Sequence, residues 1–218
     1  MSSPNWRILI VDDHPMMREG LRTLISRERD LTVCGEAETA AQALAAVAGL
    51  KPDLVLADIT LPGRNGIELI KDICALQHAM LILVISMHDE SLYAERALRA
   101  GARGYIMKQK SGPKMMQAIR QVLAGRIYLS DKMSARILEY VAGKRTEASP
   151  IERLSDREWE VFQLIGRGKS TVQIAEELHL SPKTVEAHRA RVKEKLDLRT
   201  MTELISFASR WVETQDAQ

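Results

Sequence analysis

Short apolar runs alternate with amphipathic stretches between residues 7 and 123. This alternation is typical of a parallel sheet whose strands are joined by helices. The apolar runs predict strands at residues 8–11, 31–36, 54–57, 81–86 and 103–107. The stretches between them predict helices at residues 15–28, 39–49, 66–75, 89–99 and 112–123. We therefore expect an α/β doubly wound parallel five-stranded domain, in which ligands bind outside the carboxyl ends of the strands.

The pattern changes after Gly125, where the strand-like runs stop. Residues 130–141 predict one connecting helix, and the polar residues 143–150 predict a flexible linker. Beyond the linker we expect four short helices, at residues 155–165, 170–178, 181–196 and 200–211. The chain thus divides into an α/β domain at residues 1–125, a linker with a helix at 126–150, and a small all-α domain at 151–218.

Composition supports this division and narrows the class of protein. A chain of 218 residues suits two small domains, and 45% hydrophobic with 28% charged residues excludes a largely disordered chain. No apolar run reaches the 18 residues that a membrane span needs, and the first residues lack the pattern of a secretion signal. We expect a cytoplasmic protein with no membrane contact, in which Cys34 and Cys74 are reduced core thiols.

Three carboxylates follow neighbouring strands of the expected sheet. Asp12 and Asp13 come directly after the first strand, and Asp58 comes directly after the third. Because the carboxyl ends of these strands meet at one edge, the three side chains should converge on one cleft. Hard oxygen ligands without His or Cys are the set that Mg²⁺ prefers, together with water and phosphate oxygens.

Two further polar groups end the last two strands. Ser86 closes the fourth strand and Lys108 follows the fifth, which adds a hydroxyl and an ammonium to the same edge. A carboxylate nucleophile, a divalent cation, a hydroxyl and a lysine are what phosphoryl transfer onto an aspartate requires. Each group alone is more often a turn residue, a helix cap or a solvated charge. Their joint occurrence at successive strand ends favours the functional interpretation, whereas neighbouring His14 is expected to be a solvated loop residue.

Residues 7–123 resemble a response-regulator receiver domain. The motifs that carry the resemblance are IVDD at residues 10–13, DITLPG at 58–63, IS at 85–86 and GARGYIMK at 101–108. The resemblance implies that Asp58 accepts the phosphoryl group and that Mg²⁺ is held by Asp13, Asp58, the Thr60 backbone carbonyl and, through water, Asp12. It also implies that Ser86 and Lys108 bind phosphoryl oxygens, and that Tyr105 is an aromatic switch whose ring turns inward. Two departures from the family are Ser86 in place of the commoner threonine and Gln109 in place of a proline.

The C-terminal domain has the wrong net charge for a DNA-binding protein, because residues 151–218 hold 11 basic and 12 acidic side chains. The distribution changes this picture. Residues 183–199 carry a local excess of three positive charges. The acids elsewhere, such as Glu158 and Glu160, are expected to face solvent or the other domain.

Two short helices at residues 170–178 and 181–196, joined by a tight turn, fit a helix-turn-helix whose second helix enters the major groove. The segments LSDREWEVFQLI at residues 154–165, QIAEEL at 173–178 and SPKTVEAHRARVKEKL at 181–196 resemble the LuxR-type DNA-binding domain. With the first domain in front, the chain resembles a response regulator of the NarL/FixJ class. A helical module that binds only protein is the alternative for this domain.

Helix geometry at 100° per residue separates the faces of the recognition helix. Val185 and Val192 fall on an inward stripe with Arg189 at its edge. The outward face near the N-terminus supplies the candidates for reading bases, namely Lys183, Glu186, Ala187 and Ala190. Glu186 could accept a hydrogen bond from a cytosine amino group. The candidates for phosphate contacts are Thr184, His188, Arg191 and Lys195.

These observations predict a transcription factor controlled by phosphorylation of Asp58 by a partner histidine kinase or a small phosphodonor. We expect it to be no enzyme beyond slow loss of its own phosphoryl group, and to bind double-stranded operator DNA as a homodimer. One alternative is a phosphatase of the haloacid dehalogenase type, which needs a second Asp where this chain has Thr60. Another is a regulator that ignores phosphorylation and responds to a protein partner.

Overall fold

The computed structural model describes residues 5–62, 64–141 and 150–216. The chain separates into two compact units, Met1–Lys144 and Arg145–Gln218, which are described one at a time. The first unit includes the predicted connecting helix, and most of the predicted linker lies outside the described residues. The division into parts at residues 1–125, 126–150 and 151–218 remains a prediction.

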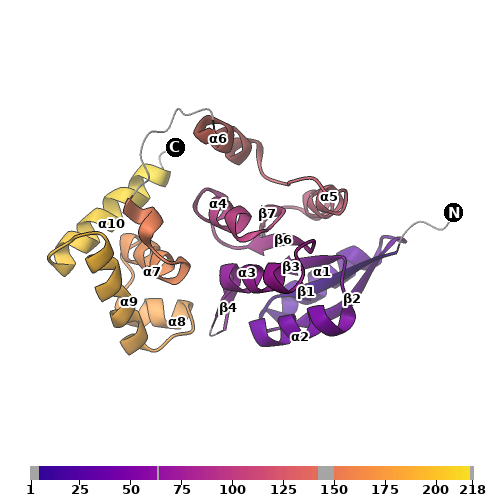
Figure 1. Cartoon of the computed structure of the whole chain (residues 1–218), viewed down its shortest axis with the longest axis horizontal. Helices are drawn as coiled ribbons and strands as arrows, with labels where there is room; N and C mark the ends of the chain where they lie inside the picture. Colours follow the sequence, from indigo (N-terminus) through magenta and orange to yellow (C-terminus); the bar gives the residue numbers. More distant parts are fainter. Residues whose placement is uncertain (1–4, 63, 142–149, 217–218) are drawn as a thin grey trace. The chain divides into compact units, whose positions relative to one another are not determined.

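A five-stranded parallel sheet forms the centre of the first unit (Figure 1). Its strand order is β2-β1-β3-β6-β7. The strands are β1 (Trp6–Val11), β2 (Leu31–Ala37), β3 (Leu54–Ala57), β6 (Leu81–Ser86) and β7 (Gly104–Met107). The central strands β3 and β6 are buried along nearly their whole length, as their continuous apolar sequences predict. The five predicted strands and the doubly wound parallel fold are confirmed.

Five helices flank the sheet, at the places where amphipathic stretches predict them. They are α1 (Pro15–Ser26), α2 (Ala40–Leu50), α3 (Gly66–Leu76), α4 (Glu90–Ala100) and α5 (Gly112–Leu123). Helices α1 and α5 contact each other over one face, where Ile25 and Ile119 join the same buried cluster as Ile8 and Leu56. Helices α2, α3 and α4 contact one another in series. The helix α6 (Asp131–Val141) follows and contacts α4.

A small hairpin between the sheet and α3 was not expected. It consists of β4 (Thr60–Leu61) and β5 (Arg64–Asn65), directly after Asp58. The hairpin leads into Gly66, whose backbone N–H donates to the carbonyl of Ile59 at 2.7 Å. A Cβ at Gly66 would lie 2.2 Å from the Asp58 carbonyl oxygen, so the close approach of these segments requires glycine.

The second unit is helical throughout its described part. It contains a 3₁₀ turn η1 (Pro150–Arg153) and the helices α7 (Asp156–Gly166), α8 (Thr171–Glu177), α9 (Pro182–Lys195) and α10 (Met201–Asp216). Ser155, Ser170 and Ser181 are the N-caps of α7, α8 and α9, as predicted, and Pro182 occupies the first turn of α9. Helix α10 continues five residues beyond the predicted end at Trp211.

Two acids of α7 are buried, contrary to the expectation that they face solvent or the other domain. Glu158 is 4% exposed and Glu160 is 1% exposed. Each carboxylate has a basic partner within the same unit: Lys195 Nζ lies 2.6 Å from Glu158 Oε2, and Arg157 Nη1 lies 2.8 Å from Glu160 Oε2. The pairing explains the burial, because a buried charge needs a counter-charge and hydrogen bonds.

Cys34 and Cys74 are free thiols, as predicted, but both are only half-buried rather than in the core. No helix within the described ranges is both long enough and apolar enough to cross a membrane.

Candidate functional site

Strand register brings the predicted carboxylates together. Val11 pairs with Ala57, so β1 and β3 end level with each other, and the next residues are Asp12 and Asp58. Ligand atoms of Asp12, Asp13, His14 and Asp58 all lie within 4.8 Å of one another. Asp12 and Asp58 are nearly inaccessible to solvent, whereas Asp13 keeps some exposure. The cluster has the carboxylate oxygens that a hard divalent cation requires, and the His14 imidazole lies beside them.

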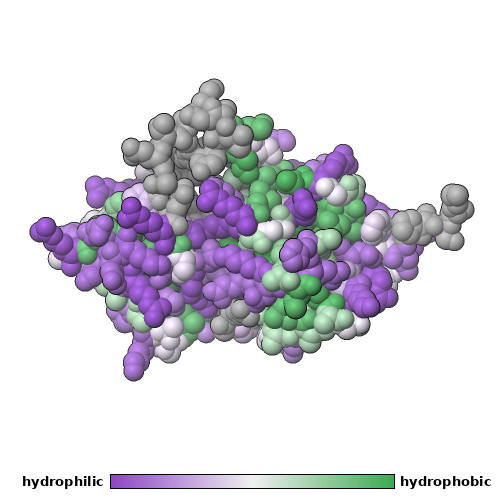
Figure 2. Space-filling model, viewed as in Figure 1, coloured by the Kyte–Doolittle hydropathy of each residue, from purple (hydrophilic) through white to green (hydrophobic). Residues whose placement is uncertain are grey.

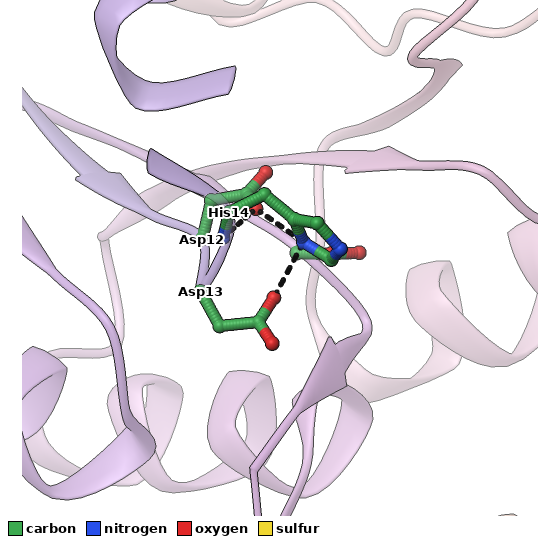
Figure 3. A group of neighbouring side chains, drawn as sticks. Asp12, Asp13 and His14 are labelled. Carbon is green, nitrogen blue, oxygen red and sulfur yellow. Dashed lines mark hydrogen bonds and ion pairs between the residues drawn. The ribbon is translucent and has the colours of Figure 1, made fainter. Parts of the chain in front are cut away.

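His14 lies closer to this cluster than a solvated loop residue would. Its Nδ1 atom is 2.7 Å from Asp13 Oδ1 and 3.2 Å from Asp12 Oδ1 (Figure 3). The imidazole is nevertheless 63% exposed, so the expectation of solvent contact is confirmed. The contact with the acidic pair was not predicted, because the adjacency of His14 to Asp13 in sequence does not fix where the ring points.

Lys108 joins two of the carboxylates. Its Nζ atom lies 2.7 Å from both Asp58 Oδ2 and Asp12 Oδ2, and its side chain is almost fully buried. Burial alone lowers the pKa of Lys108, but the charge of Asp58 and the hydrogen bonds to Asp12 and Asp58 outweigh it, so the net pKa is raised. The ammonium therefore stays charged and partly neutralises the acidic pair.

Asp58 is the carboxylate whose ionisation the site perturbs most. Burial raises the pKa of Asp58 to about 6, with Lys108 opposing the shift and Asp12 adding to it. Its Oδ1 atom accepts a hydrogen bond from the Thr60 backbone N–H at 3.2 Å. A buried carboxylate with a raised pKa, a lysine contact and two neighbouring carboxylates is a candidate for a functional group.

Ser86 is the last residue of β6, and Tyr105 lies on the neighbouring strand β7. Both side chains are fully buried. The Ser86 hydroxyl oxygen accepts from the His88 backbone N–H at 3.2 Å, and the Tyr105 hydroxyl donates to the His88 carbonyl at 2.9 Å. Burial raises the pKa of Tyr105, so its hydroxyl remains a donor. The ring that the family resemblance assigns to a switch is thus already turned inward here.

His88 was missed by the sequence reasoning. Besides its backbone contacts, its Nε2 atom lies 2.9 Å from the Thr60 hydroxyl, and its ring stacks on Tyr93 with centroids 4.8 Å apart. The only signal in the sequence is its position two residues after Ser86. Its contacts link the segment after β6 to Thr60 at the start of β4.

The second predicted site lies on α9 in the C-terminal unit. Val185 and Val192 are fully buried, which confirms the predicted inward stripe, and Arg189 is only 13% exposed at its edge. All four candidates for base contacts are exposed, namely Lys183, Glu186, Ala187 and Ala190. On the face drawn in Figure 2 the surface of this unit is mainly hydrophilic.

The candidates for phosphate contacts differ in their availability. Arg191 is exposed, whereas Thr184 and His188 are half-buried. The Thr184 hydroxyl lies 2.8 Å from the Ser181 hydroxyl at the start of the helix. The Lys195 ammonium is held by Glu158, which the sequence did not predict because the two residues are 37 positions apart.

Comparison with known proteins matches both units to established families. Residues 8–120 match the response regulator receiver domain, and residues 152–208 match the bacterial regulatory proteins of the luxR family. The chain is 33% identical to response regulator GacA of Pseudomonas aeruginosa over 204 residues, 94% of this chain and 95% of that one. It is 32% identical to the DNA-binding transcriptional activator DevR/DosR of Mycobacterium tuberculosis over 203 residues, 93% of this chain and 94% of that one.

Solved structures give the same result. RcsB from Salmonella enterica, determined bound to promoter rprA in the presence of the phosphomimetic BeF₃⁻, superposes with a TM-score of 0.62 at 26% identity. That match covers 94% of this chain and 98% of RcsB. The order of the two matched domains along the chain, the topology of the sheet and the relatives that match nearly the whole chain all indicate the same class of protein. The chain belongs to the two-component response regulators of the NarL/FixJ class, transcription factors that combine a receiver domain with a LuxR-type DNA-binding domain.

Proposed function

We propose that Asp58 is the phosphoacceptor of this response regulator. The observation that carries the proposal is the geometry of one buried carboxylate, Asp58, within 2.7 Å of Lys108 and beside Asp12 and Asp13. A carboxylate oxygen of Asp58 attacks the phosphorus, and the bond between phosphorus and the donor nitrogen of a kinase phosphohistidine breaks. Lys108 and the Ser86 hydroxyl would bind the phosphoryl oxygens as negative charge enters the site.

The metal that this chemistry calls for is Mg²⁺. Asp13, Asp58 and the Thr60 backbone carbonyl would hold it directly, and Asp12 would hold it through water. Bound Mg²⁺ supplies positive charge that offsets repulsion between the carboxylates and the incoming phosphoryl group. The donor set of carboxylate and carbonyl oxygens suits this ion, whereas a single imidazole does not make a site of the zinc type.

Intact-mass measurement tests the phosphoacceptor. Full-length protein treated with acetyl phosphate and Mg²⁺ should gain one phosphoryl group, and Asp58→Asn should gain none. Asp131→Asn, at an exposed position in the first turn of α6, is the matched control and should gain the group as the parent does. A retained mass gain in Asp58→Asn would overturn the assignment.

The proposal excludes sustained phosphatase activity. A phosphatase of the haloacid dehalogenase type needs an acid–base Asp two residues after the nucleophile, and here Thr60 occupies that position with its hydroxyl bound to His88. An aryl phosphate assay should therefore show no multiple turnover. Steady turnover would favour the enzyme over the regulator.

We further propose that phosphorylation raises affinity for operator DNA by favouring a homodimer. The base-reading residues would be Lys183, Glu186, Ala187 and Ala190, with Thr184, His188, Arg191 and Lys195 on phosphates. Exposure of the first group supports this assignment. DNA affinity and sedimentation with and without acetyl phosphate test it, and a regulator that ignores phosphorylation would show no difference in either measurement.

A further inference from the structure

Three polar side chains connect the two helices of the helix-turn-helix. The hydroxyl of Thr171, the first residue of α8, donates to Glu186 Oε1 on α9 at 2.6 Å. Arg189 Nη1, one turn further along α9, donates to the Thr171 hydroxyl oxygen and lies 3.2 Å from the same Glu186 oxygen. Thr171, Glu186 and Arg189 therefore form one network, which we call the α8–α9 triad.

Within the triad, the two carboxylate oxygens of Glu186 differ in their hydrogen bonding. Both contacts go to Oε1, and within the described part of the chain no hydrogen bond reaches Oε2. The side chain of Glu186 is 54% exposed. One oxygen is thus fixed to the protein, while the other keeps its capacity to accept a hydrogen bond from outside.

The surroundings of Arg189 are not those that would stabilise the fold best. Its side chain is 13% exposed, and its Nε atom is buried without a hydrogen-bond partner among the described residues. A buried donor left unsatisfied costs free energy, so the arrangement is not the one that stability alone would favour. The guanidinium instead directs its Nη1 atom at Thr171 and Glu186.

The charge of Arg189 also reduces the electrostatic cost of placing the Glu186 carboxylate at a DNA surface. The Glu186 carboxylate would be repelled by DNA phosphates. A guanidinium within 3.2 Å offsets this charge without occupying Oε2. A free glutamate side chain would in addition lose rotamer freedom on binding, and the triad reduces that loss by ordering the side chain beforehand.

We infer that Arg189 and Thr171 are specificity-determining positioning residues, which hold Glu186 so that its free oxygen accepts a hydrogen bond from one base, a cytosine amino group in the chemistry that suits a carboxylate. This inference rests on the proposed role of Glu186 in reading bases. Arg189 itself need touch no base.

A double-mutant cycle in the full-length protein tests the inference. The variants are Arg189→Lys, which keeps the charge but loses the planar fork, and Thr171→Val, which keeps the shape but loses the hydroxyl. Each is made in the parent and in Glu186→Ala. After acetyl phosphate and Mg²⁺ treatment checked by intact mass, selection from a random duplex library finds the preferred site. Competition binding then measures discrimination at each base pair.

We expect Arg189→Lys and Thr171→Val each to reduce discrimination about five- to tenfold at the one base pair that Glu186→Ala affects, with affinity for random duplex within about twofold of the parent. In the Glu186→Ala background neither should change discrimination further. The control is Glu177→Gln. It removes the ion pair between Glu177, the last residue of α8, and Lys169, and it should behave as the parent.

Two results would overturn the inference in distinguishable ways. If Arg189→Lys weakened all sequences alike and left base preference intact, with an unchanged melting temperature, Arg189 would serve phosphate binding rather than positioning. If Glu186→Ala itself left the preferred site unchanged while the parent remained selective, the base-reading role of Glu186 would fail, and the inference with it.

Discussion

Lys108 Nζ lies 2.7 Å from Oδ2 of Asp58, although the two residues are 50 positions apart. The same nitrogen contacts Asp12, so one ammonium occupies space between the carboxylates that a cation also needs. Under the proposed function, Lys108 would compete with a metal before phosphorylation and would be available to a phosphoryl oxygen afterwards.

Replacement of Lys108 by Ala should separate these two roles. We expect Lys108→Ala to bind Mg²⁺ at least as tightly as the parent by isothermal titration calorimetry, because a competing positive charge is gone. The same variant should fail to convert phosphorylation into tighter DNA binding. Phosphate-dependent DNA binding equal to that of the parent would show that the signal leaves the site by another route.

The pKa of Asp58 predicts a pH-dependent stability of the metal-free receiver domain. Burial raises this pKa from 3.8 to about 6, so the folded state holds the proton more tightly than the unfolded state. Its contribution is fully present below pH 3.8 and is lost as pH rises through 6. Asp58→Asn should therefore be more stable than the parent well above pH 6, by about 3 kcal/mol, and lose this advantage near pH 4. Thermal unfolding in the presence of a chelator measures the difference, and a constant difference across this range would contradict the cause.

Gly66 should tolerate no side chain. A Cβ there would lie 2.2 Å from the Asp58 carbonyl oxygen and 2.6 Å from the Ile59 Cα, both backbone atoms that cannot move aside cheaply. We expect Gly66→Ala to destabilise the receiver domain by about 2 to 4 kcal/mol and to slow phosphorylation, because the segment that carries Asp58 must shift.

Gly20 in α1 provides the control for that experiment. A Cβ at Gly20 meets nothing within 4 Å, and alanine is the better helix former, so Gly20→Ala should be neutral or stabilising by about 0.5 to 1 kcal/mol. Equal melting temperatures for both variants would show that the segment around Gly66 relaxes more easily than its backbone contacts indicate.

The C-terminal unit should bind DNA on its own. It has its own buried core, which includes Phe162, Ile174, Val185, Val192 and Leu204. We predict that the unphosphorylated receiver domain hinders the recognition helix, so a fragment of residues 150–218 should bind operator DNA at least as tightly as the unphosphorylated full chain. Markedly weaker binding by the fragment in a titration would favour dimerisation by the receiver domain as the main switch.

Arg191 should act on all DNA sequences alike. Its exposed guanidinium on α9 is a candidate phosphate contact, and each such contact releases counterions on binding. We expect Arg191→Ala to weaken specific and random duplexes by similar factors and to reduce the salt slope by about 1. Arg167→Ala, at an exposed position beyond α7, should leave the slope unchanged. A change in base preference with an unchanged slope would place Arg191 at a base instead.

The sequence predicted the acidic cluster because the position of these side chains depends only on the order of the strands in the sheet. Asp12 and Asp58 follow strands that the doubly wound order places side by side, so convergence needs no knowledge of side-chain geometry. The contacts of His14 and His88 could not be predicted in this way, because both lie in loops where ring direction depends on neighbours from distant segments. The hairpin of β4 and β5 was missed for a related reason, since two-residue strands carry no periodicity.

The burial of Glu158 and Glu160 could not be predicted from the pattern of polar and apolar residues in α7. A surface helix is expected to have one wet face, but α7 contacts α8, α9 and α10. These acids pair with Arg157, which is largely buried, and with Lys195, which stays 40% exposed while part of its charge is offset by Glu158. Counting charges along the C-terminal domain therefore mixes internal pairs with the surface that DNA would meet.

Helix α9 is fastened at both ends. The Ser181 side chain caps its first turn, and Lys195 in its last turn is held by the buried Glu158 carboxylate. A recognition helix restrained in this way is already folded before it contacts DNA, so little further folding of the chain accompanies binding. Recognition should then show a small heat-capacity change for its buried area, unlike that of basic segments that become helical only on contact with the double helix.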